Sequence, residues 1–170
     1  LNAGTFPYGI HLVAVDSKEE MQQLEAICLK HQLFLISDEA YREFTYDGIA
    51  TSALKLDKIA EQVIVVDTIS KRYSACGARI GAFITKNKEV YAAAMKFAQA
   101  RLSPPSFAQI LGEAAVDLPA DYFDEVHAEY TSRRDTLVKR LKAINGVTCP
   151  LPGGAFYAMA RLPVNDSEKF

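Results

Sequence analysis

The sequence lacks the features that mark several special classes of protein. Its 170 residues contain 19 Lys and Arg against 21 Asp and Glu, so the formal net charge is only −2. A chain with this balance has no basic excess of the kind that binds nucleic acid, and we expect no nucleic-acid partner. No apolar run is long enough to cross a membrane and no signal peptide is visible, so we expect no membrane partner either.

Cysteine and histidine are also scarce. The three cysteines, Cys28, Cys76 and Cys149, form no CxxC pair, and this usage fits a reducing cytoplasm better than a disulfide framework. The three histidines lie far apart and show no metal-ligand spacing, so we expect no metal site. Because 49% of the residues are apolar, the chain can bury a core of its own. These features favour a folded cytoplasmic protein.

The clearest signal in the sequence is a short apolar run that ends in polar side chains. Val63–Val66 is rich in β-branched residues and predicts a buried strand. Thr68, Ser70 and Lys71 follow it closely, and Arg79 comes eight positions after the lysine. Hydroxyls and an arginine suit a phosphate dianion, and a partly desolvated lysine can act as an amine nucleophile. Because open α/β sheets bind ligands at the carboxyl ends of their strands, we expect a ligand site here.

A second apolar run ends in the same manner. Residues 33–37 are followed by Asp38 and, three residues later, by Tyr41. The segment between the two runs is polar and weakly helical. A strand, a crossover and a second strand together predict a parallel pair. The sequence therefore predicts an α/β unit in which both strands end in polar residues.

Taken together, the two stretches resemble the class I/II pyridoxal-phosphate aminotransferases of fold type I. The matching motifs are Asp38-x-x-Tyr41 and Ser70-Lys71-x-x-Ser74-Ala75-x-Gly77-x-Arg79-Ile80-Gly81. The resemblance implies an α/β fold, namely part of the fold type I large domain, with a mostly parallel sheet and flanking helices, running into the start of the small domain. It covers roughly residues 17–161, well under half of a typical family member, so we expect the chain to be a piece of an enzyme.

The resemblance implies pyridoxal 5'-phosphate as the cofactor and assigns the residues around its ring. Lys71 takes the place of the lysine that forms a Schiff base with the cofactor and shuttles the α-proton of the substrate. Asp38 is expected to pair with the protonated pyridine nitrogen, so that the ring can act as an electron sink. Tyr41 is expected to hydrogen-bond the phenolic oxygen of the ring. Lys71 and Tyr41 are therefore the predicted catalytic residues.

The resemblance also assigns the residues around the cofactor phosphate. Arg79 is expected to grip the phosphate, with Ser70 and Thr68 as further anchors. Thr68 departs from the family, which more often has serine or glycine at this position. It keeps a hydroxyl, so a phosphate contact is still expected.

The implied reaction moves an amino group between an amino acid and a 2-oxo acid. The run Ser70-Lys71-Arg72-Tyr73-Ser74 is most similar to bacterial aspartate aminotransferases, so aspartate is the candidate amino acid. Family members are usually dimers with active sites at the interface, so the resemblance implies a homodimer for the full-length enzyme.

Three other interpretations compete with a transaminase. Relatives of the family include lyases, which the lysine loop does not separate from transaminases. The chain can also be a non-catalytic fragment, because positioning groups found elsewhere in the family are missing. Leu33–Ile36 followed by Asp38 and Glu39 has the shape of the Walker B strand of a P-loop ATPase. The sequence contains no G-x-x-x-x-G-K-[ST] run, which argues strongly against that class.

The resemblance and the helix and turn signals divide the chain into four parts. Residues 1–16 are unclear, since Phe6 stands where the family has the asparagine of an Asn-Pro-Thr-Gly turn, and we expect this stretch to be foreign to the family. Residues 17–120 correspond to part of the cofactor-binding large domain. Residues 121–146 are a long linking helix, and residues 147–170 are the start of the small C-terminal domain.

Residue spacing predicts further elements within these parts. The predicted helices run from a capping box at Ser17 to Lys30, over 88–101, from a proline break at 103–105 to Pro119, and over 121–144. The further predicted strands cover 80–85 and 152–157. We expect the aromatic residues of these helices, such as Phe97, Phe107 and Tyr130, to pack in the core.

Overall fold

The helices and strands predicted between residues 17 and 144 are found in the predicted order. The computed structural model describes residues 4–6, 9–12, 18–48, 50–119, 121–166 and 168. The elements, in chain order, are β1 (Gly4–Phe6), β2 (Gly9–Leu12), α1 (Lys18–His31), β3 (Phe34–Asp38), β4 (Val63–Thr68), α2 (Ile69–Arg72), β5 (Gly81–Thr85), α3 (Lys88–Arg101), α4 (Ser106–Val116) and α5 (Asp121–Lys142). Short 3-10 helices at Ala53–Lys55, Asp57–Ile59 and Cys76–Ala78 complete the list. The capping serine Ser17 lies outside the described residues. Among the helices described, none is long and apolar enough to span a membrane.

The five strands form one sheet in the order β1-β2-β3-β4-β5. β2 pairs with β3 and β3 pairs with β4 in parallel, which confirms the predicted parallel pair. The two outer pairings, β1 with β2 and β4 with β5, are antiparallel. The α/β class is confirmed, and the sheet is mixed, with its parallel strands at the centre. Between β4 and β5 the chain forms only short helical turns, so it returns along the neighbouring strand in the opposite direction.

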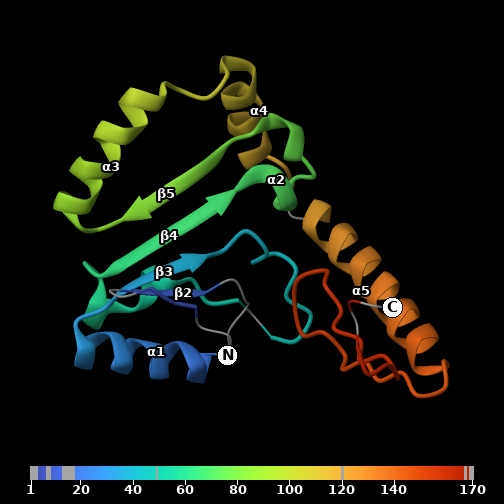
Figure 1. Ribbon diagram of the computed structural model, residues 1–170. Coiled ribbons are helices and arrows are strands. Elements are labelled where there is room, and N and C mark those ends of the chain that lie inside the picture. The colour runs from blue at the N-terminus through green and yellow to red at the C-terminus, as the bar shows by residue number, and fades with distance from the viewer. Residues whose placement is uncertain are drawn as a thin grey trace.

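The core lies between α1 and one face of the sheet (Figure 1). Met21, Leu24 and Cys28 of α1 are at most 5% exposed, because they recur at helical spacing and share one face. On the sheet, Leu35 and Val65 are 0% and 1% exposed. Burying one such aliphatic side chain contributes about 1.5–3 kcal/mol. This core therefore fixes β3 and β4, the two strands whose ends carry the predicted site.

The helices beyond β5 are packed much less tightly. α3 and α4 lie on the far side of β5 from α1 (Figure 1). None of the side chains of α3 is buried. Phe97 is 78% exposed and Phe107 of α4 is 88% exposed. The expectation that these two rings pack in the core is therefore wrong, because the described residues contain no element that covers them.

The last segment of the chain runs beside α5, and the strand predicted over 152–157 is not formed. The segment makes two isolated β-bridges, between Thr45 and Gly154 and between Thr148 and Arg161, and only the first involves residues 152–157. Ala155 has a φ of 57°, in the left-handed region, so the extended backbone is interrupted there. The segment 153–155 is instead tied to the loop after β3 by single hydrogen bonds.

Candidate active site

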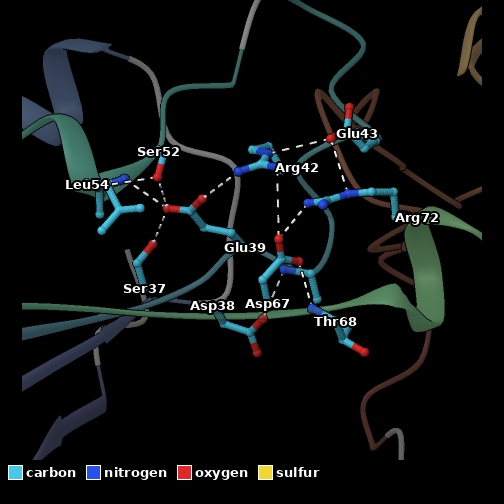
Figure 2. A network of polar contacts seen from close by, with 12 residues as sticks. Ser37, Asp38, Glu39, Arg42, Glu43, Ser52, Leu54, Asp67, Thr68 and Arg72 are labelled. Carbon is cyan, nitrogen blue, oxygen red and sulfur yellow. Dashed lines mark hydrogen bonds and ion pairs between the residues drawn. The ribbon is translucent and has the colours of Figure 1, made fainter. Parts of the chain in front are cut away.

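Asp38 lies at the carboxyl end of β3, on the opposite face of the sheet from the core. Side chains alternate along a strand, so Leu35, Ser37 and Glu39 are buried whereas Asp38 is only half-buried. Its Oδ1 accepts a hydrogen bond of 3.1 Å from the backbone N–H of Ala40. In Figure 2 the Asp38 carboxylate points away from the polar network that surrounds Glu39. Its second oxygen makes no hydrogen bond with a described residue.

Thr68 and Ser70 come together at the end of β4. The Thr68 hydroxyl caps α2 by accepting from the backbone N–H of Ser70 at 3.1 Å. Its Oγ1 also lies 2.9 Å from Ser70 Oγ and 2.9 Å from the carbonyl oxygen of Ile80. The two hydroxyls predicted to face a phosphate are therefore adjacent, and the cap fixes the turn that carries Lys71.

Lys71 points its amine toward aromatic rings. Its Nζ lies 5.9 Å from the centre of the Tyr41 ring and 5.6 Å from the centre of the Phe156 ring, within the range of cation–π attraction. The structure thus brings together the two residues predicted to be catalytic, although they are 30 positions apart in the sequence. Phe156, which comes from the last segment of the chain, was not predicted to lie at this site.

Tyr41 is held in its neutral form. Burial, followed by the hydrogen bond and charge interaction with Tyr157 and by the charge of Asp38, raises the pKa of Tyr41 from its ordinary value of 10.0 to about 12. The Tyr41 and Tyr157 hydroxyls are hydrogen-bonded to each other. At neutral pH the phenol can therefore donate a hydrogen bond to a ligand.

Arg79 is not brought to the two hydroxyls. The backbone of Arg79 has a φ of 55°, and the side-chain Nη1 donates to the carbonyl oxygen of Cys76 at 3.0 Å. The side chain lines a cavity of about 430 Å³ whose other residues include Asp67, Phe83 and Arg101. Within the described part of the chain, no hydrogen bond or ion pair joins Arg79 to Thr68, Ser70 or Lys71. The predicted phosphate anchor is exposed and points elsewhere.

The glycine that closes the second motif has a clear steric reason. A Cβ at Gly81 would lie 2.6 Å from the carbonyl oxygen of Asp67 in the neighbouring strand. Only glycine lets β5 approach β4 so closely at this point. This approach holds the segment that carries Arg79 beside the end of β4.

A network of charges beside the site was missed by the motif comparison (Figure 2). Glu39 is 8% exposed and accepts hydrogen bonds from Ser52 Oγ at 2.9 Å and from the backbone N–H of Ala53 at 2.8 Å. It also pairs with Arg42 at 3.2 Å. Strand alternation could have found it, since Glu39 follows Leu35 and Ser37 on the core face.

The second half of the network consists of Asp67 and Glu43, whose carboxylates compensate the positive charge of Arg72, the neighbour of Lys71 in the sequence. Arg72 Nη2 donates to Asp67 at 2.6 Å. Arg72 Nε lies 3.3 Å from Glu43 Oε1, close enough for charge attraction but without hydrogen-bond geometry. Arg72 is thus turned toward the carboxylates and away from the Lys71 amine. The network ties α2 to the loop after β3, so it fixes the two loops that carry Lys71 and Tyr41.

The described residues contain no cluster of three or more His, Cys, Asp or Glu side chains that could hold a metal ion. The arrangement instead gathers an amine, a carboxylate, a neutral phenol and two hydroxyls. These groups offer a nucleophilic amine and several hydrogen-bond donors to a ligand.

Comparison with known protein families agrees with the motifs. The model of the family described as aminotransferase class I and II matches residues 14–170. The chain is 30% identical over 161 residues to the aspartate aminotransferase of Bacillus subtilis (strain 168), which covers 92% of this chain and 39% of that protein. It is 31% identical over 163 residues to the aspartate aminotransferase of Rhizobium meliloti (strain 1021), with 94% and 39% covered.

Solved structures give the same result. The alanine aminotransferase from Pyrococcus furiosus superposes with a TM-score of 0.78 at 33% identity, over 90% of this chain and 40% of that one. The aspartate aminotransferase from Rhizobium meliloti superposes with a TM-score of 0.79 at 30% identity, over 86% and 38%. The chain therefore spans about two fifths of the length of these relatives.

Proposed function

Because the chain belongs to the class I and II aminotransferase family, we propose that it acts in a pyridoxal-phosphate-dependent transaminase that moves an amino group between an amino acid and a 2-oxo acid. The observation that carries this proposal is the position of the Lys71 amine beside Tyr41, at the ends of two parallel strands. We propose Lys71 as the residue that holds the cofactor covalently. The proposed activity is that of a whole enzyme, because the relatives are about two and a half times as long as this chain.

The residues present fit pyridoxal phosphate at its ring end. An amine, a carboxylate and a neutral phenol from Lys71, Asp38 and Tyr41 correspond to its aldehyde, its protonated ring nitrogen and its phenolic oxygen. At the phosphate end, the hydroxyls of Thr68 and Ser70 are adjacent. We propose that Arg79 joins them by a rotation of its exposed side chain, which is held by one hydrogen bond to Cys76.

When bound, the cofactor supplies an electron-accepting ring that stabilises negative charge at the α-carbon of the substrate. The chain then has three tasks. The Lys71 amine would take the proton from the α-carbon of the substrate and pass it to the cofactor carbon that keeps the amino group. Asp38 keeps the ring nitrogen protonated through its negative charge. The Phe156 and Tyr41 rings orient the Lys71 amine through cation–π attraction.

We propose aspartate as the first amino acid to assay. Relatives from several bacteria are named for aspartate, whereas others are named for aromatic amino acids or alanine. These three classes form the test panel. We also propose a homodimer for the whole enzyme, as the family resemblance implies. A cytoplasmic location is supported by the three cysteines, which are all free thiols.

A second candidate is a non-catalytic folded piece of such an enzyme. The exposed apolar rings of α3 and α4 and the distant position of Arg79 favour it. The third candidate is a lyase of the same fold, because no residue of the site distinguishes a lyase from a transaminase. The assay of aspartate, alanine and an aromatic amino acid with 2-oxoglutarate distinguishes the first two candidates, because the non-catalytic piece gives no 2-oxo acid product.

Trapping of the cofactor tests the role of Lys71. We expect that borohydride reduction in the presence of pyridoxal phosphate attaches a pyridoxyl group to the peptide that contains Lys71, as read by peptide mass mapping. Lys71→Ala should abolish this adduct. Lys96→Ala removes an exposed lysine from α3 and should leave it unchanged. Equal labelling of many surface lysines, or an adduct that survives Lys71→Ala, would contradict the proposal.

A further inference from the structure

Five aromatic side chains pack into a cluster, and two of their rings, Tyr41 and Phe156, face the Lys71 amine. This aromatic cluster consists of Tyr41, Phe44, Tyr130, Phe156 and Tyr157. The Phe156 ring is its centre, with ring centres 5.0 Å from Tyr41, 5.2 Å from Phe44 and 5.5 Å from Tyr130. Its members come from the loop after β3, from α5 and from the last segment of the chain. The cluster therefore places residues more than 100 positions apart in the sequence at one site.

The last segment is held firmly against the loop after β3. The backbone N–H of Ala155 donates to the carbonyl oxygen of Phe44 at 2.8 Å, and the N–H of Tyr46 donates to the carbonyl oxygen of Gly153 at 2.9 Å. Ala155 adopts a left-handed φ of 57°, a conformation that costs energy for a residue with a Cβ. This bend follows the two backbone hydrogen bonds and directs Phe156 and Tyr157 toward Tyr41.

The hydroxyls of Tyr157 and Tyr41 meet beside Lys71. They form a hydrogen bond with each other. Phe156, the neighbour of Tyr157 in the sequence, lies under the Lys71 amine. Two phenols carry two hydrogens, and only one of them lies between the two oxygens. The other hydrogen is left to be donated to a third atom.

We propose that Tyr157 is a positioning residue of this site: it orients the Tyr41 hydroxyl beside Lys71, and the two phenols together present one hydrogen to an anionic oxygen of the bound ligand. This inference rests on the function proposed above, in which that oxygen is the phenolic oxygen of pyridoxal phosphate. The phenol of Tyr41 is oriented before the ligand arrives, so less ordering is needed on binding.

The charges around the pair agree with this role. Besides Tyr157, the charged groups that face Tyr41 are Asp38, whose negative charge disfavours the phenolate, and the Lys71 amine, 5.9 Å from the ring. Between pH 10.0 and about 12 the unfolded chain releases the Tyr41 proton while the folded chain keeps it. The contribution of Tyr41 to folding stability is therefore complete below pH 10.0 and is lost as the pH rises through about 12.

Tyrosine titration of the cofactor-free chain is the first test. The chain is labelled with ¹³C at the tyrosine ζ carbon, and the Tyr41 signal is identified by its loss in Tyr41→Phe. In Tyr157→Phe we expect the pKa of Tyr41 to fall below about 12 and to stay above 10.0, because burial still acts on it. Tyr130→Phe removes a hydroxyl from the same cluster without contact to Tyr41, and it should leave the titration unchanged.

Cofactor trapping is the second test. In Tyr157→Phe, the concentration of pyridoxal phosphate that half-labels Lys71 should rise about 3-fold to 10-fold, the effect of one hydrogen bond. Tyr130→Phe should match the wild type. Because Tyr157 is 60% exposed and phenylalanine keeps its ring, the variant should fold, as circular dichroism checks.

The outcomes separate the two proposals. An unchanged Tyr41 titration in Tyr157→Phe overturns the inference, whatever the cofactor does. Equal labelling of Lys71 in the wild type and in Tyr157→Phe also overturns it, while the proposed function stands. If Lys71 is not labelled in the wild type, the proposed function fails, and the inference that depends on it fails too.

Discussion

Helices α1 and α3 have the same length, 14 residues each, and both carry apolar residues at helical spacing. α1 buries Met21, Leu24 and Cys28 against the sheet. α3 buries none of its side chains, and its Tyr91 and Phe97 are 53% and 78% exposed. An amphipathic pattern therefore shows that a helix has an apolar face, but it does not show what covers that face.

The candidate site shows the same contrast between a tightly packed side, next to α1, and a loosely packed side, next to β5. On the α1 side, β3 and β4 are fixed by the core, and Glu39 and Asp67 tie the loops together. On the β5 side, Phe83 is 45% exposed and Arg79 is held by one hydrogen bond. The residues proposed to bind the cofactor ring lie on the firmly packed side, and Arg79, the proposed phosphate anchor, lies on the open side. This explains why Lys71 and Tyr41 meet whereas Arg79 does not reach Ser70.

The largest expected effect tests the two helices directly. Leu24→Ala in α1 should lower the free energy of unfolding by about 2–5 kcal/mol, because it leaves a cavity in the core. Met95→Ala in α3 should lower it by less than about 1 kcal/mol, since Met95 is 39% exposed. Urea unfolding followed by circular dichroism measures both. Similar losses of unfolding free energy at Leu24 and Met95 would contradict the contrast between α1 and α3.

A smaller effect is expected at the polar end of the core. Glu39→Gln should cost about 1–3 kcal/mol of unfolding free energy, because the amide oxygen can still accept from Ser52 and Ala53 but the NH2 group cannot accept from Arg42, which loses its ion pair. Glu113→Gln, on the exposed surface of α4, is the matched control and should change stability by less than about 0.5 kcal/mol. Equal effects in urea unfolding would show that the network is not structural.

The smallest effect on stability is expected on the exposed apolar surface. The double variant Phe97→Ser and Phe107→Ser should change the free energy of unfolding by less than about 1 kcal/mol, because these rings are 78% and 88% exposed. It should reduce binding of a hydrophobic fluorescent dye, since it removes exposed aromatic area.

A control double variant, Gln99→Ser and Glu113→Ser, changes exposed polar residues on the same two helices and should leave dye binding unchanged. A loss of stability as large as that of Leu24→Ala would show that the two rings are covered in solution. In that case the contrast between α1 and α3 would be wrong.

Local signals predicted most of the elements well. The helix over 88–101 is found with the same bounds, because Asn87 caps its first turn and the apolar spacing is regular. The strand run at 63–66 and the break at Pro104–Pro105 are confirmed in the same way. The prediction of a strand over 152–157 was wrong. The small and apolar residues of this segment are typical of a strand, but the backbone bends at Ala155. Pro7 and Tyr8, in the stretch that the sequence leaves unclear, lie outside the described residues.

The candidate site was predicted where the motif residues are close in sequence. Thr68 and Ser70 lie together because a helix cap joins residues two apart. Glu39 was overlooked because the motif comparison took Asp38 alone from a strand whose alternation puts its neighbour on the other face. Phe156 and Tyr157 were missed because no local pattern links them to Tyr41, more than 100 positions away.

The sequence by itself determined the order of the main helices and strands between residues 17 and 144, the two polar strand ends and the family of the chain, because these follow from residue spacing and short motifs. The tertiary structure alone decided which apolar faces are covered, which charges pair with Arg72, and which rings surround Lys71. Such contacts join residues that are far apart in the chain. They depend on how the packed elements meet, and the local pattern of residues does not contain that information.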